Sequence, residues 1–124
     1  MATSESFKDF VLENLERANA EFSLNFTFSA RKMFGEYCIY VNDKGVLKPL
    51  CLLCDESVFV KKLAELAEFV AQNAEHFETG YPYDGAKEHF IIDTENAEFL
   101  GALLEILVPL LPVPKPKKHP YKTR

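Results

Sequence analysis

The sequence predicts a single small domain of the α+β class, in which an antiparallel sheet is accompanied by an N-terminal, a middle and a C-terminal helix. Three observations predict this class: apolar residues at helical spacing in three segments, apolar and polar residues that alternate between positions 26 and 60, and turn residues between the alternating runs. A chain of 124 residues with 48% hydrophobic composition suits one domain around one core. We assign this domain to residues 1–111.

Three segments carry apolar residues at the spacings of three and four that an amphipathic helix requires. They cover residues 4–21, 61–77 and 97–111. Acidic residues near the start of the first segment, together with Ser6, suit a helix N-terminus. The last segment is apolar round most of its circumference, and we expect Pro109 to kink or end its helix.

Alternating residues predict strands at positions 26–30, 36–41, 46–54, 58–60 and 89–93. The run Asn-Asp-Lys-Gly at positions 42–45 has the chemistry of a hairpin turn, with Gly45 free to take positive φ. Pro49 indicates an edge or a bulge within the third strand, because proline has no N–H for the ladder. Residues 55–57 should turn the chain again, and residues 80–85 form a turn-rich connection that could include a short strand.

Residues 30–40 read Ala-Arg-Lys-Met-Phe-Gly-Glu-Tyr-Cys-Ile-Tyr, a basic pair followed by Met-Phe-Gly and then by a strand. This segment resembles the N-terminal domain of the TfoX/Sxy family, bacterial regulators linked to competence. The motif of that family reads roughly Arg-x-Met-Phe-Gly-Gly-Tyr-Gly-aliphatic-Tyr. The chain departs from it at Glu36 and Cys38, where the family usually has small residues. The matching positions are Arg31, Met33, Phe34, Gly35, Tyr37, Ile39 and Tyr40.

The resemblance extends over residues 6–111 and implies a stand-alone domain of this type. Full-length members of the family add a second, helical domain, for which these 124 residues leave no room. What the resemblance implies about function is a non-enzymatic regulatory or protein-interaction module with a connection to competence regulation.

Two regions are candidates for contact with a protein partner or with a second copy of the chain. The basic pair beside the glycine could bind a phosphate or an acidic partner, or it could be a solvated strand end with Arg31 paired to an acid. The apolar last helix must either pack against the first helix as well as the sheet or offer an interface to a homodimer or another protein. The candidate residues are Arg31, Lys32, Gly35, Tyr37, Leu100, Leu104 and Leu107.

Residues 112–124 combine four prolines with five basic residues and no acid, and we expect an extended, disordered tail. These cations could contact the phosphates of a nucleic acid while Tyr121 stacks on a base. The alternative is a solubilising terminus, because the chain as a whole carries a net charge of −5. A nucleic-acid-associated accessory protein is therefore the second hypothesis, with contacts from Lys115, Lys117, Lys118, Lys122 and Arg124.

The cysteines and histidines predict no catalytic, cofactor-binding or metal site. Cys51 and Cys54 form a CxxC pair, but residues three apart on a strand face opposite sides at about 10 Å, whereas a disulfide needs less than about 7 Å. Zinc would need further ligands at compatible spacing, and a turn that begins early, at Leu53, would leave that interpretation open. The three histidines form no triad with a nucleophile. A redox or metal protein is thus the least favoured hypothesis, and we predict no enzyme.

Three further features of the sequence bear on the cellular location. The first residues form no apolar run of signal-peptide type, and the longest apolar stretch, residues 99–113, would span roughly 20 Å as a helix against about 30 Å for a bilayer core. Three cysteines, an odd number, suit a reducing compartment. We therefore expect a cytoplasmic protein with no membrane partner.

Overall fold

The first helix shows why this sequence folds as it does locally. In the computed structural model, which describes residues 3–113, helix α1 covers Glu5–Glu21. Ser4 caps it: its hydroxyl accepts a hydrogen bond from the backbone N–H of Phe7 at 3.1 Å, which satisfies one of the free amides of the first turn. Val11, Leu15 and Ala18 are buried, at the spacing of four and three that the sequence predicts.

Four strands follow as consecutive antiparallel hairpins joined by two-residue turns. In each turn both central residues have positive φ, as a type I′ turn requires, and this geometry matches the twist of the flanking strands. The turn residues are Phe34 with Gly35, Lys44 with Gly45, and Asp55 with Glu56. The four strands are β1 (Phe26–Met33), β2 (Glu36–Asp43), β3 (Val46–Cys54) and β4 (Ser57–Lys61).

A bulge in β3 confirms the interpretation of Pro49. Ile39 pairs with Cys51 while the next residue, Tyr40, pairs with Pro49, so Leu50 is an extra residue on the β3 side. The ladder between β3 and β4 covers only residues 52–54, so Pro49 has the bulge on its β2 side and no ladder partner on its β4 side.

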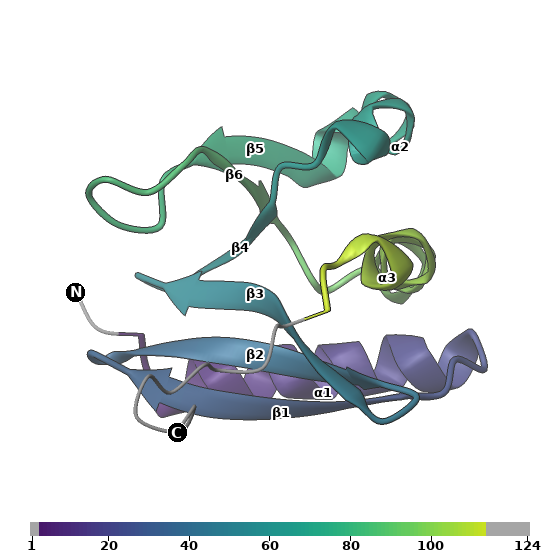
Figure 1. Cartoon of the computed structure of the whole chain (residues 1–124), viewed down its shortest axis with the longest axis horizontal. Helices are drawn as coiled ribbons and strands as arrows, with labels where there is room; N and C mark the ends of the chain where they lie inside the picture. Colours follow the sequence, from purple (N-terminus) through teal and green to yellow (C-terminus); the bar gives the residue numbers. More distant parts are fainter. Residues whose placement is uncertain (1–2, 114–124) are drawn as a thin grey trace, which may run out of the picture.

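The sheet is completed by β5 (Phe77–Gly80) and β6 (His89–Ile92), and its order is β1-β2-β3-β4-β6-β5 with antiparallel neighbours throughout. β6 therefore inserts between β4 and β5. Figure 1 shows the sheet curving from β1 and β2 up to β5, with α1 behind β1 and β2. The α+β class and the single domain predicted from the sequence are confirmed.

The expected middle helix over residues 61–77 is much shorter in the structure. Lys61 still belongs to β4, the α-helical part α2 covers only Ala67–Gln72, and it lies between the 3₁₀ turns Ala64–Leu66 and Ala74–His76. Asn73 ends α2 with φ −130°, and its side-chain amide donates to the Phe69 carbonyl at 2.9 Å. From Asn73 onward the predicted helix was wrong. Phe77, the last apolar residue at helical spacing in this segment, begins β5 and so belongs to a strand.

Helix α3 (Ala97–Leu110) forms the centre of the core. The Asn96 side chain caps its start by accepting from the Phe99 amide at 3.0 Å, and the helix ends one residue after Pro109, as expected. α3 packs beside α1 so closely that a Cβ on Gly101 would clash with the ring of Phe22. Among residues 3–113, no helix has the length and apolar content needed to cross a membrane.

Candidate interaction surface

The turn between β1 and β2 holds a bulky aromatic residue in an unusual conformation. Phe34 has φ +52°, in the left-handed region that favours glycine and asparagine, and its exposed fraction is 101%. The neighbouring Gly35 has φ +82° and takes the second turn position without steric cost. The hairpin thus presents a phenylalanine ring to solvent at the cost of backbone strain.

An open apolar hollow of about 530 Å³ lies beside this turn, and we call it the hairpin hollow. It joins the β1–β2 turn and the end of β3 to the segment that follows β5, and Figure 1 shows that segment and the turn on the same side of the molecule. Tyr81, which precedes the two lining residues of that segment, is itself exposed. The residues that line the hollow are Met33, Phe34, Glu36, Tyr37, Leu52, Cys54, Pro82 and Tyr83.

Lys8 Nζ stands 5.7 Å from the ring centre of the lining residue Tyr37, and a single carboxylate lines the hairpin hollow. Glu36 lines it, and the Oε1 atom of Glu36 accepts hydrogen bonds from the backbone amides of Thr3 at 2.9 Å and Asp55 at 3.4 Å. Burial, together with the carboxylates of Glu36 and Asp55, raises the pKa of the Cys54 thiol to about 11. The hollow therefore combines apolar walls with one carboxylate and a thiol that stays neutral at physiological pH.

Three of the four strand residues predicted for this surface lie in the turn or at its flanks. Gly35 forms the turn, Tyr37 lines the hollow and is buried, and Lys32 is exposed on β1. Arg31 does not line the hollow. Its guanidinium stands 5.2 Å from the ring centre of Tyr40 on the neighbouring strand. The predicted alternative, an Arg31–carboxylate pair, is replaced by this cation–π contact.

The leucines predicted as an interface on the last helix are buried inside the domain. Leu100, Leu104 and Leu107 each have an exposed fraction of 1% or less, because α1 and the sheet cover the face of α3 that carries them. As an interaction surface these three residues are a wrong prediction for the folded chain. The alternative given above, packing of the last helix against both the first helix and the sheet, is the one that the structure contains.

The CxxC cysteines occupy two sides of β3. Cys51 pairs with Ile39 on the core side, whereas Cys54, three residues on, lines the hairpin hollow. Both thiols are free and buried, and burial raises the pKa of Cys51 as it does that of Cys54. Within residues 3–113, no three His, Cys, Asp or Glu side chains come together in a way that could hold a metal ion.

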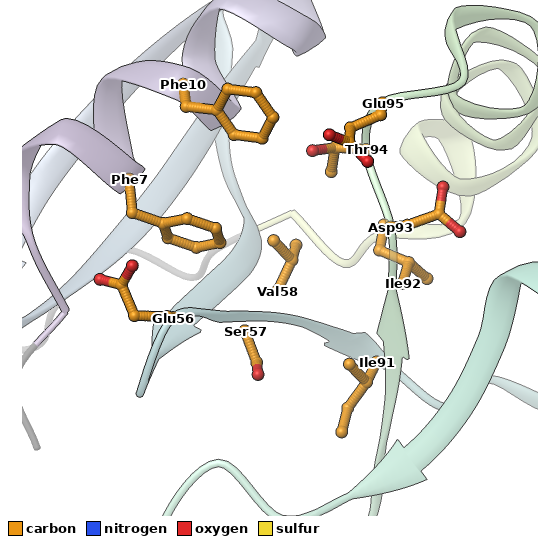
Figure 2. Close-up of a pocket in the computed structure, with 10 residues that line it drawn as sticks. All are labelled: Phe7, Phe10, Glu56, Ser57, Val58, Ile91, Ile92, Asp93, Thr94 and Glu95. Carbon is orange, nitrogen blue, oxygen red and sulfur yellow. The ribbon is translucent and has the colours of Figure 1, made fainter.

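A second hollow, of about 310 Å³, lies between the start of α1 and the link from β6 to α3. Figure 2 shows Phe7 and Phe10 on one side of it, Thr94 and Glu95 on the other, and Val58 between them. Several of its polar groups already have partners in the domain. Thr94 Oγ1 accepts from Asn14 at 3.0 Å, and Asp93 Oδ2 lies 2.9 Å from His76 Nδ1. These contacts join elements of the fold and leave fewer groups for a ligand.

Phe34 lies in the segment of residues 31–37 that the sequence predicts as a surface but is not one of the residues named there, and Tyr83 lies outside that segment. One signal in the sequence could have found Phe34: a bulky residue directly before glycine, in a two-residue loop between two alternating runs. Tyr83 gives no comparable signal, because its position beside β3 depends on how β5 and β6 join the sheet. The predicted nucleic-acid contacts of residues 115–124 lie outside the described residues.

The fold and the hairpin hollow define a small α+β protein with an open apolar site beside a strained turn. The chain is 34% identical, over 125 residues, to a protein of Spirochaeta aurantia described as an uncharacterized 12.7 kDa protein in the trpE 5′ region, and the alignment covers 99% of this chain and 96% of the relative. The chain belongs to the same family as that protein. No family model and no solved structure matches it. The similarity to the TfoX/Sxy motif stays a prediction from residues 30–40.

Proposed function

We propose that this protein is a non-enzymatic protein-interaction module that binds its partner at the hairpin hollow. The observation that carries the proposal is Phe34, a fully exposed aromatic ring held at positive φ beside an apolar hollow. Strained residues and exposed apolar patches concentrate at binding sites, because neither contributes to the stability of the free protein. Aromatic residues and methionine are also enriched at the centres of protein interfaces.

The chemistry of the hollow supports binding more than catalysis. Its thiol, Cys54, is neutral at physiological pH because its pKa is raised, so it is a poor nucleophile. Its carboxylate, Glu36, accepts hydrogen bonds from two backbone amides and fixes the N-terminal segment to the β3–β4 turn. A volume of about 530 Å³ is enough to receive apolar side chains of a partner.

The experiment is affinity capture from a lysate of the source organism, with the purified full-length chain as bait. We expect a partner that is retained by the wild type and reduced about tenfold or more by Phe34→Ser, because central aromatic residues dominate interface energies. Leu47→Ser is the matched control, since Leu47 is also an exposed apolar residue but is the second residue of β3, whose other end lines the hollow. Retention of the same proteins by all three baits would contradict the proposal.

The similarity to TfoX/Sxy adds a regulatory role in competence to this proposal. It depends on the motif residues, of which Met33, Phe34 and Tyr37 line the hollow. The test is the transformation frequency of a strain that lacks the protein, complemented with the wild type, Phe34→Ser or Leu47→Ser. We expect restoration by the wild type and the control only. An unchanged transformation frequency in the deletion strain would make the competence role wrong. The result of the capture experiment would still stand.

A further inference from the structure

The hairpin hollow has the composition of a site for a basic, proline-rich chain. Aromatic side chains line it at Phe34, Tyr37 and Tyr83, and grooves of this kind bind proline-rich segments in an extended conformation. Glu36 lies in its wall, and Asp55 is close enough to act on the thiol of Cys54. Carboxylates beside aromatic rings suit lysine side chains, whose stems are apolar and whose ends are charged.

A segment with this complementary chemistry belongs to the chain itself. Residues 114–124 read Pro-Lys-Pro-Lys-Lys-His-Pro-Tyr-Lys-Thr-Arg, with three prolines, five cations and no acid. The segment follows Val113, the last described residue, which is exposed. The proline content of the segment suits the aromatic walls of the hairpin hollow, and its cations suit the carboxylate of Glu36 in the lining.

The length of the segment is sufficient to reach the hollow. Lys48 Nζ donates a hydrogen bond of 3.1 Å to the carbonyl of Val108, so the last turn of α3 lies against the first half of β3. From Lys48 to Cys54 the strand advances about 20 Å, and Cys54 lines the hollow. Eleven residues in an extended polyproline conformation span about 34 Å, which exceeds that distance.

We propose that residues 114–124 dock in the hairpin hollow of their own chain and compete there with the partner. The competition rests on the proposed function, whereas the docking does not require a partner. The second hollow, shown in Figure 2, is the less suitable acceptor. It is smaller, at about 310 Å³ against about 530 Å³. Its carboxylates Glu56 and Asp93 are engaged within the domain, as Glu36 of the hairpin hollow is, so volume and aromatic lining separate the two hollows and charge does not.

The chain contains no tryptophan, so a single replacement gives an unambiguous reporter. In the full-length Tyr121→Trp protein, we expect blue-shifted emission and acrylamide quenching about threefold weaker than in a free peptide of residues 114–124, since docking shields the indole from solvent. Adding Phe34→Ser or Glu36→Gln should remove the protection, whereas adding Leu47→Ser should leave it. About 0.5 M salt should weaken it, because the contact is partly electrostatic.

Trypsin provides a second readout that does not depend on position 121. Cleavage after Lys117 and Lys118 in the otherwise unmodified full-length chain should be about threefold slower than in Phe34→Ser, because proteolysis follows the population of the undocked state. Equal rates in the two proteins, together with peptide-like quenching of the tryptophan, would overturn the proposal. Protection that grows with protein concentration would overturn docking within one chain. Both measurements use purified protein, so their failure is distinguishable from a failure to capture a partner.

Discussion

Helix α3 and the β1–β2 turn are the two regions where apolar residues suggest a contact surface, and the fold treats them in opposite ways. α3 is apolar round most of its circumference, yet its leucines are buried against α1 and the sheet. The turn contributes only Met33 and Phe34, and both are exposed. Apolar content alone therefore does not locate an interface in this protein. A better indicator is an apolar side chain that the fold exposes at the cost of backbone strain.

The largest expected effect on stability comes from the buried leucines of α3. Leu104→Ala should lower the free energy of unfolding by about 3 kcal/mol, because it removes buried methyl groups and leaves a cavity in the core. Ile106→Ala on the same helix is the control and should cost less than about 1 kcal/mol, since Ile106 is half exposed. Urea denaturation of the three proteins measures both values. Equal losses would mean that the α3 leucines are not in the core.

The next effect concerns the close approach of α3 and α1. Gly101→Ala should cost about 1–2 kcal/mol, because the added methyl group meets the ring of Phe22 and the gain in helix propensity offsets only part of the clash. In a Phe22→Ala background the same change should be neutral or stabilising. The double-mutant cycle in urea gives the coupling energy. A coupling energy of zero would contradict this packing.

A pH effect tests the electrostatics of the hairpin hollow. The pKa of Cys54 is raised from 9.0 to about 11, so between these pH values the folded chain keeps a proton that the unfolded chain releases. Stability due to this group is therefore fully present below pH 9 and falls as pH rises, by at most about 1.4 kcal/mol per unit. The difference in urea midpoint between wild type and Cys54→Ala should narrow above pH 9. A difference in urea midpoint that does not change with pH would mean that the pKa of Cys54 is not raised in the folded chain.

The smallest expected effect on stability comes from the exposed β1–β2 turn. Phe34→Asn should raise the free energy of unfolding by about 0.5–1 kcal/mol, because asparagine tolerates positive φ and the phenylalanine ring makes no buried contact to lose. Thermal unfolding measures the gain. Capture of the partner should nevertheless decrease, so that a stabilised protein binds less well. A destabilised Phe34→Asn protein would show that the ring supports the fold.

The sequence predicted those parts of the fold in which period and turn chemistry agree. Residues 4–21, the hairpin strands and the last helix follow a clear period of 3.6 or 2, and turn residues separate them. The middle segment differs, because its apolar residues keep a helical spacing up to Phe77 although Phe77 pairs with Ile92 in the sheet. Tertiary pairing overrides local pattern there, and local pattern contains no information about it.

The candidate site could be predicted only in part, for a similar reason. Gly35 and the flanking residues follow from the motif, but the hollow also needs Pro82 and Tyr83, which reach it through the arrangement of β5 and β6. The leucines of α3 show the converse error. Their burial depends on how closely α1 approaches, and that distance is set by Gly101, a single small residue.

The position of β6 between β4 and β5 has a consequence for the order in which the chain can fold. The hairpins from β1 to β4 join strands adjacent in sequence, so their contacts form early and at little loop-closure cost. β5 has no partner until β6 has been synthesised, because it pairs with β6 alone. A nascent chain that stops before His89 thus leaves the edge of β4 open to other strands. A released chain that is truncated between residues 62 and 88 should therefore aggregate more readily than the full chain.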